Sequence, residues 1–256
     1  MEALKRMVRQ TPVYDVIWWF RARKQASKWT AEDDQMLQFY SQFVKPGDVC
    51  FDVGANTGNR TKVFLKLASH VVAVEPQDKC ARLIDSVFGR DKRLTIVRKA
   101  LGAAEGQAEM RVSNSSTVSS LSGEWIDAVQ KSGRFSDTSW DAKQPVLLTT
   151  LDCLIHEHGV PAFIKIDVEG FEAEVLKGLS QPVKTLSLEF TPEYLQATYQ
   201  CIEHLRSLGD IRLNYSLGET MRLVLDRWVE PQEMVNLLES LKDDRSIFGD
   251  VYVTFV

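Results

Sequence analysis

The chain has 256 residues, of which 44% are hydrophobic and 26% are charged, so it is long enough for one α/β domain with a full core. Its formal net charge of −4 argues against a general nucleic-acid binder, because such proteins carry a basic excess. The four cysteines show no C-x-x-C spacing, which argues against a zinc site and favours small buried thiols in a reducing compartment.

The N-terminal region predicts a helical extension over residues 1–45, and the main domain follows over residues 46–256. A Lys-Pro-Gly-Asp turn at residues 45–48 separates the two parts. The extension lacks the apolar core of a signal peptide, and its apolar run at residues 16–20 is too short to cross a membrane. We therefore expect a cytoplasmic protein without a transmembrane segment.

Within this extension, residues 16–28 predict a short helix with an aromatic face and a basic face. Aromatic side chains such as Trp18 and Trp19 usually serve packing, so we favour packing of this helix on the main domain or on a second subunit of a homodimer. Contact with a membrane surface is the alternative that the sequence leaves open.

Short apolar runs alternate with amphipathic stretches along the main domain, which is typical of a parallel sheet with helices on both faces. The predicted strands are residues 49–53, 71–74, 94–97, 146–149, 162–166, 185–190, 212–215, 223–225 and 251–256. The predicted helices are residues 61–68, 78–88 and 169–179, a helix ending near Leu205, and residues 231–242. The sequence therefore predicts a doubly wound α/β fold with a mainly parallel sheet.

The alternation stops over residues 102–145, where residues 107–112 are the only stretch with the character of a strand. The rest of this stretch lacks a clean period, and we expect it to be irregular. Because residues 113–145 contain Trp125 and Trp140, we interpret this segment as a lid or substrate-binding segment rather than a linker.

A glycine-containing loop at residues 51–58, with the sequence Phe-Asp-Val-Gly-Ala-Asn-Thr-Gly, follows the first strand of the main domain. Ligands bind at such strand-to-helix junctions in doubly wound sheets. Gly54 permits close approach of a ligand, and Gly58 opens the next helix. Backbone N–H groups at the helix start suit a ligand carboxylate, and Asp52 suits a ligand ammonium group. This combination points to a methionine-type cofactor.

Glu75 ends the second strand and can accept hydrogen bonds from the two hydroxyls of a ribose. A dinucleotide site uses similar geometry but has the fingerprint G-x-G-x-x-G, whereas this loop has glycines only at positions 54 and 58. Asp52 would also repel a pyrophosphate. The loop therefore favours S-adenosylmethionine over a nicotinamide dinucleotide.

A second block, Lys-Ile-Asp-Val-Glu-Gly-Phe-Glu at residues 165–172, continues into Val-Leu-Lys-Gly at residues 175–178. Together with the loop at residues 52–58, it resembles the FkbM family of S-adenosylmethionine-dependent methyltransferases. The resemblance extends over residues 44–190 and includes Ser-Ser-Leu at residues 119–121. It implies a class I, Rossmann-like methyltransferase sheet that ends in an antiparallel strand, and methyl transfer to a hydroxyl, often of a sugar, polyketide or similar small molecule. Residues 122–145 depart from the family's pattern.

The resemblance also implies roles for single residues. The methionine part of the cofactor would lie against Asp52, Gly54, Asn56 and Gly58. The ribose would lie against Glu75 and the neighbouring Pro76, and the adenine beside Lys99 and Ala100. Ser120 would approach the cofactor, and Asp167 would face its methionine end and the methyl group.

Methyl transfer to a hydroxyl benefits from a general base within hydrogen-bond reach. Asp167 and Glu169 follow a central strand and would begin the next helix, and Glu189 ends the strand after it. All three would lie at the ligand-binding edge of the sheet, so they are the candidate catalytic residues. The four histidines fall in places where surface or packing roles are more common.

These three carboxylates could in principle bind a divalent cation, but no Asp-Asp-Asn set accompanies them, so we expect no required metal. The sequence favours an O-methyltransferase that uses S-adenosylmethionine and acts on a small molecule or glycan. N-methylation on the same fold, a nicotinamide-dependent oxidoreductase, and a non-catalytic scaffold that binds a partner through the Trp18-Trp19 helix are the alternatives.

Overall fold

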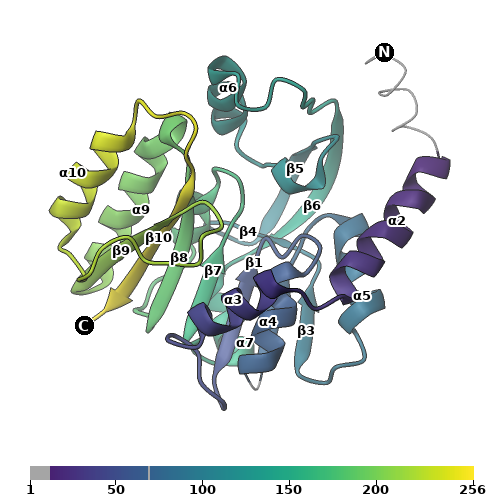
Figure 1. Ribbon diagram of the computed structural model, residues 1–256, viewed down its shortest axis with the longest axis horizontal. Helices are drawn as coiled ribbons and strands as arrows, with labels where there is room; N and C mark the ends of the chain where they lie inside the picture. The colour runs from purple at the N-terminus through teal and green to yellow at the C-terminus, as the bar shows by residue number, and fades with distance from the viewer. Residues whose placement is uncertain (1–11, 69) are drawn as a thin grey trace.

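A computed structural model describes residues 12–68 and 70–256 and shows an α/β fold built around a seven-stranded sheet (Figure 1). The strand order is β3-β2-β1-β7-β8-β10-β9. β10 is antiparallel to both of its neighbours, and the pairs among the other five consecutive strands are parallel. The predicted doubly wound, mainly parallel sheet with a C-terminal antiparallel strand is confirmed.

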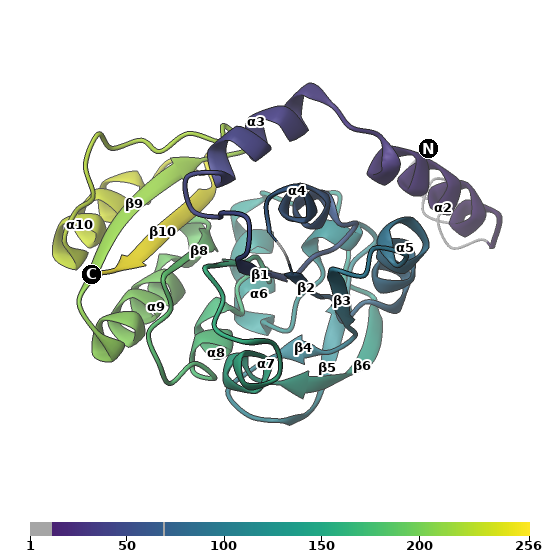
Figure 2. The ribbon, with the colours of Figure 1, turned by 90° about the horizontal axis from the view of Figure 1, so that it is seen from below.

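The strands of this sheet are β1 (Val49–Val53), β2 (His70–Val74), β3 (Leu94–Val97), β7 (Phe163–Ile166), β8 (Thr185–Phe190), β9 (Ile211–Leu217) and β10 (Gly249–Phe255). The helices that flank it are α3 (Ala31–Tyr40), α4 (Asn59–Leu67), α5 (Asp78–Phe88), α7 (Leu151–His158), α8 (Glu172–Leu176), α9 (Leu195–Leu208) and α10 (Pro231–Leu241). Helices α3, α4 and α5 cover one face, and α7, α8 and α9 cover the other (Figure 2).

Alternate side chains of each strand point to opposite sides of the sheet, and the helices bury the side chains on both faces. In β1, Cys50 packs with α3 and α4 in a cluster rich in aromatic rings, whereas Phe51 and Val53 pack with α7, α8 and α9. Burial on both faces explains why these strands read as continuous apolar runs in the sequence.

A second, three-stranded sheet in the order β4-β6-β5 borders the stretch that was expected to be irregular. It consists of β4 (Ala100–Leu101), β5 (Gly106–Val112) and β6 (Ala142–Thr149). The strand predicted at residues 107–112 is confirmed, but the strand predicted at residues 146–149 begins at residue 142. At the start of β6, Ala142, Lys143 and Pro145 are exposed and Gln144 is half-buried, so these residues give no apolar signal.

The segment between β5 and β6 is folded and packed, so the prediction of irregular structure was wrong. It contains η1 (Ser116–Val118) and α6 (Gly123–Ser132). Trp125 and Trp140 share an apolar cluster, and the Trp140 indole N–H donates to the Val118 carbonyl at 2.6 Å. A function as a lid or substrate-binding segment stays a prediction.

Two further predicted elements differ from the structure. The helix predicted at residues 169–179 begins only at Glu172, because residues 169 and 170 adopt left-handed backbone angles that no helix continues. Consequently Asp167 and Glu169 do not form its first turn. Residues 223–225 are not a strand: Val224 N–H bonds to the Tyr215 carbonyl, but no ladder follows.

The described part of the N-terminal extension consists of α2 (Pro12–Ser27) and α3, and residues 1–11 of the predicted extension lie outside the described chain. Thr30 immediately precedes α3, and its N–H donates to the Asp33 carboxylate at 2.7 Å. No helix in the described ranges is both long and apolar enough to cross a membrane.

Gly170, in the loop after β7, lies in close contact with Trp125 of α6. Its φ is +85°, and a Cβ added there would lie 2.3 Å from the Trp125 Cβ. Gly133 has a similar φ of +81° but no neighbour within 4 Å of such a Cβ. Alanine substitutions at these two positions therefore distinguish the cost of a left-handed backbone from the cost of steric overlap.

We expect Gly133→Ala to lower the free energy of unfolding by about 1 kcal/mol through left-handed strain alone. Gly170→Ala should cost about 3 kcal/mol, because overlap with Trp125 adds to that strain. Urea denaturation of both variants measures the difference. Equal losses in the two variants would contradict the close contact between this loop and α6.

Candidate active site

A cavity of about 250 Å³ lies at the carboxyl ends of β1, β2, β7 and β8. In doubly wound sheets this edge is where ligands bind. The cavity brings together most of the residues predicted from the sequence, namely Asp52, Gly54, Asn56, Glu75, Pro76, Ala100, Asp167, Glu169 and Glu189. One side of the cavity is closed by Met110 of β5 and by Leu121 of the segment between β5 and β6.

Three predicted cofactor residues do not line this cavity. Gly58 precedes α4, and a Cβ there would lie 2.9 Å from the Phe88 ring, so it is needed for helix packing. Ser120 is buried, and its hydroxyl donates to the Glu169 carbonyl at 2.6 Å. Lys99 lies in the turn before β4. Direct contact of these three residues with a cofactor stays a prediction.

Asp52 lies near the end of β1 and is only 2% exposed. Its Oδ2 accepts a hydrogen bond of 2.5 Å from the Thr61 hydroxyl on α4. Burial raises the pKa of Asp52 to about 6, against the opposing effect of the Thr61 hydrogen bond. A ligand cation that replaced the lost hydration would therefore favour the ionised carboxylate.

Glu75 follows β2 and is also 2% exposed. Its two carboxylate oxygens accept backbone hydrogen bonds of 2.7 Å, one from Asn56 N–H and one from Gln77 N–H. These bonds fix the carboxylate plane and connect the loops after β1 and β2. Each oxygen has lone pairs left for a further donor, such as a ribose hydroxyl. Burial raises the pKa of Glu75 to about 7.

Gly54 allows the loop after β1 to approach the loop after β7. Its φ is +82°, and a Cβ added there would lie 1.8 Å from the Asp167 carbonyl oxygen. The neighbouring Asn56 is also left-handed, with φ of 48°. A glycine is therefore required at this position by the close contact between the loops after β1 and β7.

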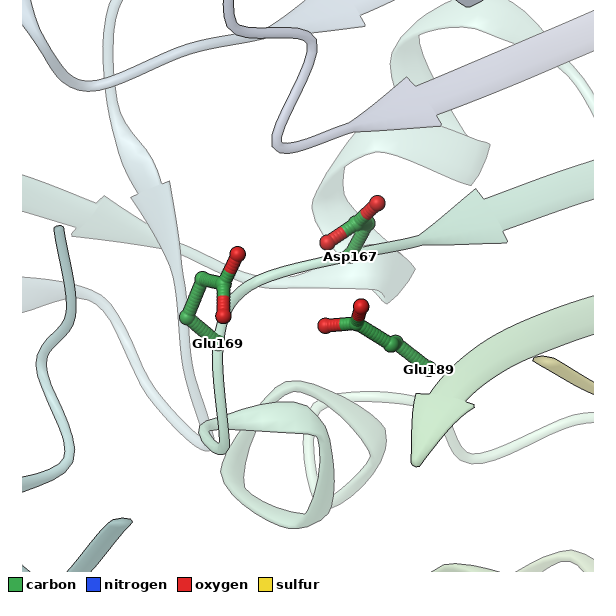
Figure 3. Close-up of side chains that lie close together, drawn as sticks. All are labelled: Asp167, Glu169 and Glu189. Atoms are coloured by element: carbon green, nitrogen blue, oxygen red, sulfur yellow. The ribbon is translucent and has the colours of Figure 1, made fainter. Parts of the chain in front are cut away.

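Three carboxylates meet at the other end of the cavity. Asp167, Glu169 and Glu189 each have an oxygen within 4.8 Å of the other two (Figure 3). Such spacing would also suit a hard divalent cation, so the expectation that no metal is required stays a prediction. The structure thus confirms that the three candidate catalytic residues lie together.

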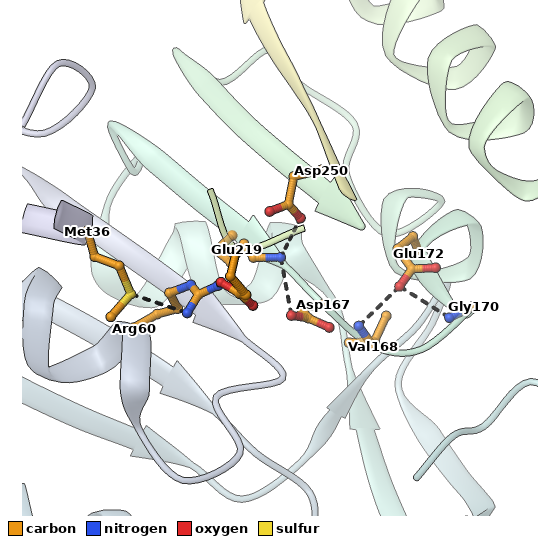
Figure 4. Close-up of polar contacts among 9 residues, drawn as sticks. Met36, Arg60, Asp167, Val168, Gly170, Glu172, Glu219 and Asp250 are labelled. Atoms are coloured by element: carbon orange, nitrogen blue, oxygen red, sulfur yellow. Dashed lines mark hydrogen bonds and ion pairs between the residues drawn. The ribbon is translucent and has the colours of Figure 1, made fainter. Parts of the chain in front are cut away.

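Lys165 places a buried cation beside this group. Its Nζ lies 2.7 Å from Asp250 Oδ1 and 3.2 Å from Asp167 Oδ2 (Figure 4). The side chain is 2% exposed, whereas that of Asp167 is 36% exposed. As expected from strand alternation, Lys165 and Asp167 share one side of the chain. The Lys165 ammonium therefore holds the Asp167 carboxylate, and the exposed part of that carboxylate faces the cavity.

The loop that positions Glu169 is held from two directions. Glu172 Oε1 accepts from Val168 N–H at 3.1 Å and from Gly170 N–H at 3.3 Å (Figure 4). Ser120 holds the Glu169 carbonyl from the other side. Glu169 has a φ of 55°. The hydrogen bonds that Glu172 and Ser120 make to this loop hold Glu169 in the strained conformation. Its side chain thereby points toward Asp167 and Glu189.

Loss of hydration raises the pKa of Glu169 and of Glu189 well above the ordinary range, and the negative charge of Asp167 adds to this effect. Lys165 opposes it. A carboxylate with a raised pKa is a stronger proton acceptor in its ionised form, which is the property that a general base needs.

Arg60, in the first turn of α4, lies at the mouth of the cavity. One of its terminal nitrogens pairs with Glu219 at 2.5 Å, and the other lies 3.2 Å from Met36 Sδ (Figure 4). Its buried Nε has no hydrogen-bond partner in the described part of the chain. The guanidinium thus connects α4, α3 and the loop after β9.

None of the cavity-lining residues in the described chain is a histidine. His70 begins β2 at the opposite edge of the sheet, and its ring centroid lies 5.6 Å from that of His158. His204 contacts the Leu179 carbonyl at 3.0 Å. The described histidines therefore lie outside this cavity.

The sequence missed several polar residues of the site. Lys165 was visible inside the Lys-Ile-Asp motif, and its alternation with Asp167 was the available signal. Asp250 and Glu219 follow in the C-terminal part of the chain, without a motif. Pairing of β10 with β8, which sets Asp250 opposite Glu189, brings the first of them to the site.

We expect Lys165→Met to lower the free energy of unfolding by about 3–5 kcal/mol, because it leaves buried Asp250 without its cation. The double variant Lys165→Met/Asp250→Leu should recover much of this loss, since it removes the unpaired charge. Urea denaturation of the single and double variants gives the coupling energy. Additive losses would show that the two side chains do not stabilise each other.

Known proteins resemble the chain at low sequence identity. No curated protein matches it. Among solved structures, the chain is similar to methyltransferase FkbM from Methylobacillus flagellatus KT, with 15% identity and a TM-score of 0.47 over 94% of this chain and 60% of that one. It is also similar to an S-adenosylmethionine-dependent O-methyltransferase from Thermotoga maritima, with 15% identity and a TM-score of 0.42 over 86% of this chain and 64% of that one. It thus spans less than two thirds of either.

The sequence itself matches the methyltransferase FkbM domain over residues 52–234, which is most of its length. This range contains Asp52 and Glu75 as well as Asp167, Glu169 and Glu189. The resemblance seen in the two sequence blocks is therefore confirmed, and the chain belongs to the FkbM methyltransferase family.

Proposed function

We propose that the protein is an S-adenosylmethionine-dependent methyltransferase that acts on a hydroxyl of a small molecule or glycan. The observation that supports this most is the placement of two buried carboxylates, Asp52 and Glu75, at neighbouring strand ends in one cavity. Membership of the FkbM methyltransferase family agrees with it.

The donor and acceptor set of this cavity suits an adenosyl ligand that ends in an amino acid. Asp52 can bind an ammonium group, and the fixed carboxylate of Glu75 can accept from two ribose hydroxyls. When bound, S-adenosylmethionine would supply an activated methyl group on a sulfonium. The protein's task is then to bind the ligand and to align the acceptor within roughly 3–3.5 Å of that methyl group.

A nicotinamide dinucleotide fits this cavity less well. Its pyrophosphate would lie near the loop after β1, beside the acidic Asp52. The two cations among the described lining residues are already paired, Lys165 with Asp250 and Arg60 with Glu219. The glycine pattern of the loop also lacks the dinucleotide fingerprint. Fluorescence titration with NADH distinguishes this alternative.

Glu189 and Glu169 are the strongest candidates for the general base. One oxygen of Asp167 is already engaged by the Lys165 ammonium at 3.2 Å, so we assign Asp167 a binding role. In our proposal the acceptor hydroxyl would donate its proton to the carboxylate of Glu189 or Glu169 as its oxygen bonds to the methyl carbon, while the bond from that carbon to the sulfonium sulfur would break and leave its electron pair on sulfur as a neutral thioether. Asp167 orients the reactants at the cavity wall.

An amine acceptor is the second candidate. Three carboxylates within 4.8 Å of one another would attract an ammonium group, which would have to lose a proton before methylation. The acid group thus supports either acceptor class. Comparing acceptors that differ only by a hydroxyl or an amine at one position separates them.

We expect S-adenosylmethionine to bind with an affinity that rises roughly tenfold or more between pH 5.5 and pH 8. The pKa of Asp52 is about 6 and that of Glu75 about 7, and the ligand prefers both ionised, so binding below pH 7 releases protons. Calorimetry across this pH range, in buffers of different ionisation enthalpy, measures the affinity and the protons released.

The variants Asp52→Asn and Glu75→Gln keep the shape of the site and remove its charge. Each should weaken binding at pH 8 and flatten the pH dependence. In the free protein, the raised pKa values mean that these groups make stability fall as pH rises from about 4 toward 7. Absence of binding of both S-adenosylmethionine and its demethylated product would refute the proposal.

We expect Glu189→Gln to lower the rate of methyl transfer by about 10²–10⁴-fold while cofactor binding stays near normal, because it removes a proton acceptor and leaves the cofactor end intact. The rate is followed by formation of S-adenosylhomocysteine with any acceptor that the wild-type protein methylates. Glu169→Gln is the matched comparison, and the larger loss identifies the base.

Two control measurements accompany this comparison. Activity should survive EDTA, in line with the expectation that no metal is required. Tight cofactor binding without transfer to a broad panel of hydroxyl and amine acceptors would instead favour the non-catalytic scaffold.

A further inference from the structure

Helix α2 exposes large apolar side chains to solvent on one face. Val16 is 55% exposed, Ile17 is 43% exposed and Phe20 is 66% exposed. Successive helical residues are separated by about 100°, so these three share one side of the helix. Isolated exposed apolar residues are common, but three on one short helix face form a contiguous surface.

These side chains are not needed to attach α2 to the protein. The opposite side makes that contact: Ala26 is buried, and Trp18 and Ala22 line a groove against the main domain. The Lys79 Nζ of α5 lies 4.0 Å from the centroid of the Trp18 ring. Figure 2 shows α2 lying beside α5 at the edge of the molecule. The apolar face therefore points outward from an anchored helix.

Cations extend the same surface. The C-terminal half of α2 and the residue after it expose Arg21, Arg23, Lys24 and Lys28. On a helical projection Lys24 falls beside Phe20 and Ile17, and Arg21 and Arg23 flank them, while Lys28 directly follows the end of the helix. We name the seven residues Val16, Ile17, Phe20, Arg21, Arg23, Lys24 and Lys28 the outer face of α2.

The charge of the chain is divided in the same way. Residues 1–28 contain seven Lys or Arg and two Asp or Glu, which gives this part a net charge of +5. Since the whole chain carries −4, residues 29–256 carry −9. The positive charge is thus concentrated at the end of the chain that contains the outer face.

We propose that the outer face of α2 binds the surface of an anionic lipid bilayer, with Val16, Ile17 and Phe20 entering the boundary between headgroups and acyl chains. Apolar residues flanked by Lys and Arg on an exposed helix face suit both parts of that boundary. A symmetric contact with a second copy would bring Arg21, Arg23 and Lys24 of both copies together, where like charges repel. The assignment is independent of methyl transfer.

Cosedimentation of the full-length protein with vesicles tests the proposal. Binding is expected to vesicles in which about a third of the phosphatidylcholine is replaced by phosphatidylglycerol, and little binding is expected to phosphatidylcholine alone. It should weaken as salt rises, because salt screens the attraction of the cations. The triple variant Arg21→Gln/Arg23→Gln/Lys24→Gln should reduce the partition coefficient by about 100-fold, and Phe20→Ser by about tenfold.

Matched controls change similar side chains elsewhere on the surface. Lys92→Gln/Lys177→Gln/Arg206→Gln removes three exposed cations, and Val160→Ser removes an apolar side chain that is 57% exposed. Both control variants should bind vesicles like the wild type, and circular dichroism should show all variants folded. Unchanged binding of the α2 variants, or an equal loss in the controls, would overturn the assignment. So would self-association that Phe20→Ser abolishes, with no binding to vesicles.

Discussion

The concentration of acidic side chains at one edge of the sheet is the constraint on which the site depends. Parallel strands bring their carboxyl ends together, so Asp52, Asp167 and Glu189 meet although they are far apart in the chain. Burial and the negative charge of Asp167 raise the pKa of Glu169 and of Glu189. Lys165 opposes this effect and places a buried ammonium between Asp167 and Asp250. A single buried cation thereby stabilises the acidic group at this edge of the sheet.

The segment between β5 and β6 of the small sheet also helps to position the acidic residues of the site. Ser120 bonds to the Glu169 carbonyl, and Trp125 fills the space that only a glycine at position 170 leaves free. The loop that carries Glu169 is therefore fixed by residues that lie much earlier in the sequence. Substitutions in this segment can affect the reactive carboxylates without touching a ligand, because they act through the backbone of that loop.

Charge also organises the molecule at a larger scale. The main domain is acidic and gathers carboxylates around the cavity of the proposed cofactor site. The segment of residues 1–28 is basic, and the outer face of α2 directs part of that charge to solvent.

The sequence alone determined the sheet architecture, the loop after β1, and the position of Asp52, Glu75, Asp167, Glu169 and Glu189 at one edge. Apolar periodicity and strand-end motifs are local signals, and parallel topology converts them into a shared site. Only the tertiary structure decided the start of α8, the folded structure of residues 113–141 and the pairing of Lys165 with Asp250. These depend on left-handed backbone at Glu169, on packing around Trp125, and on the pairing of β10 with β8. Contacts of that kind join residues distant in the chain, so no local pattern reveals them.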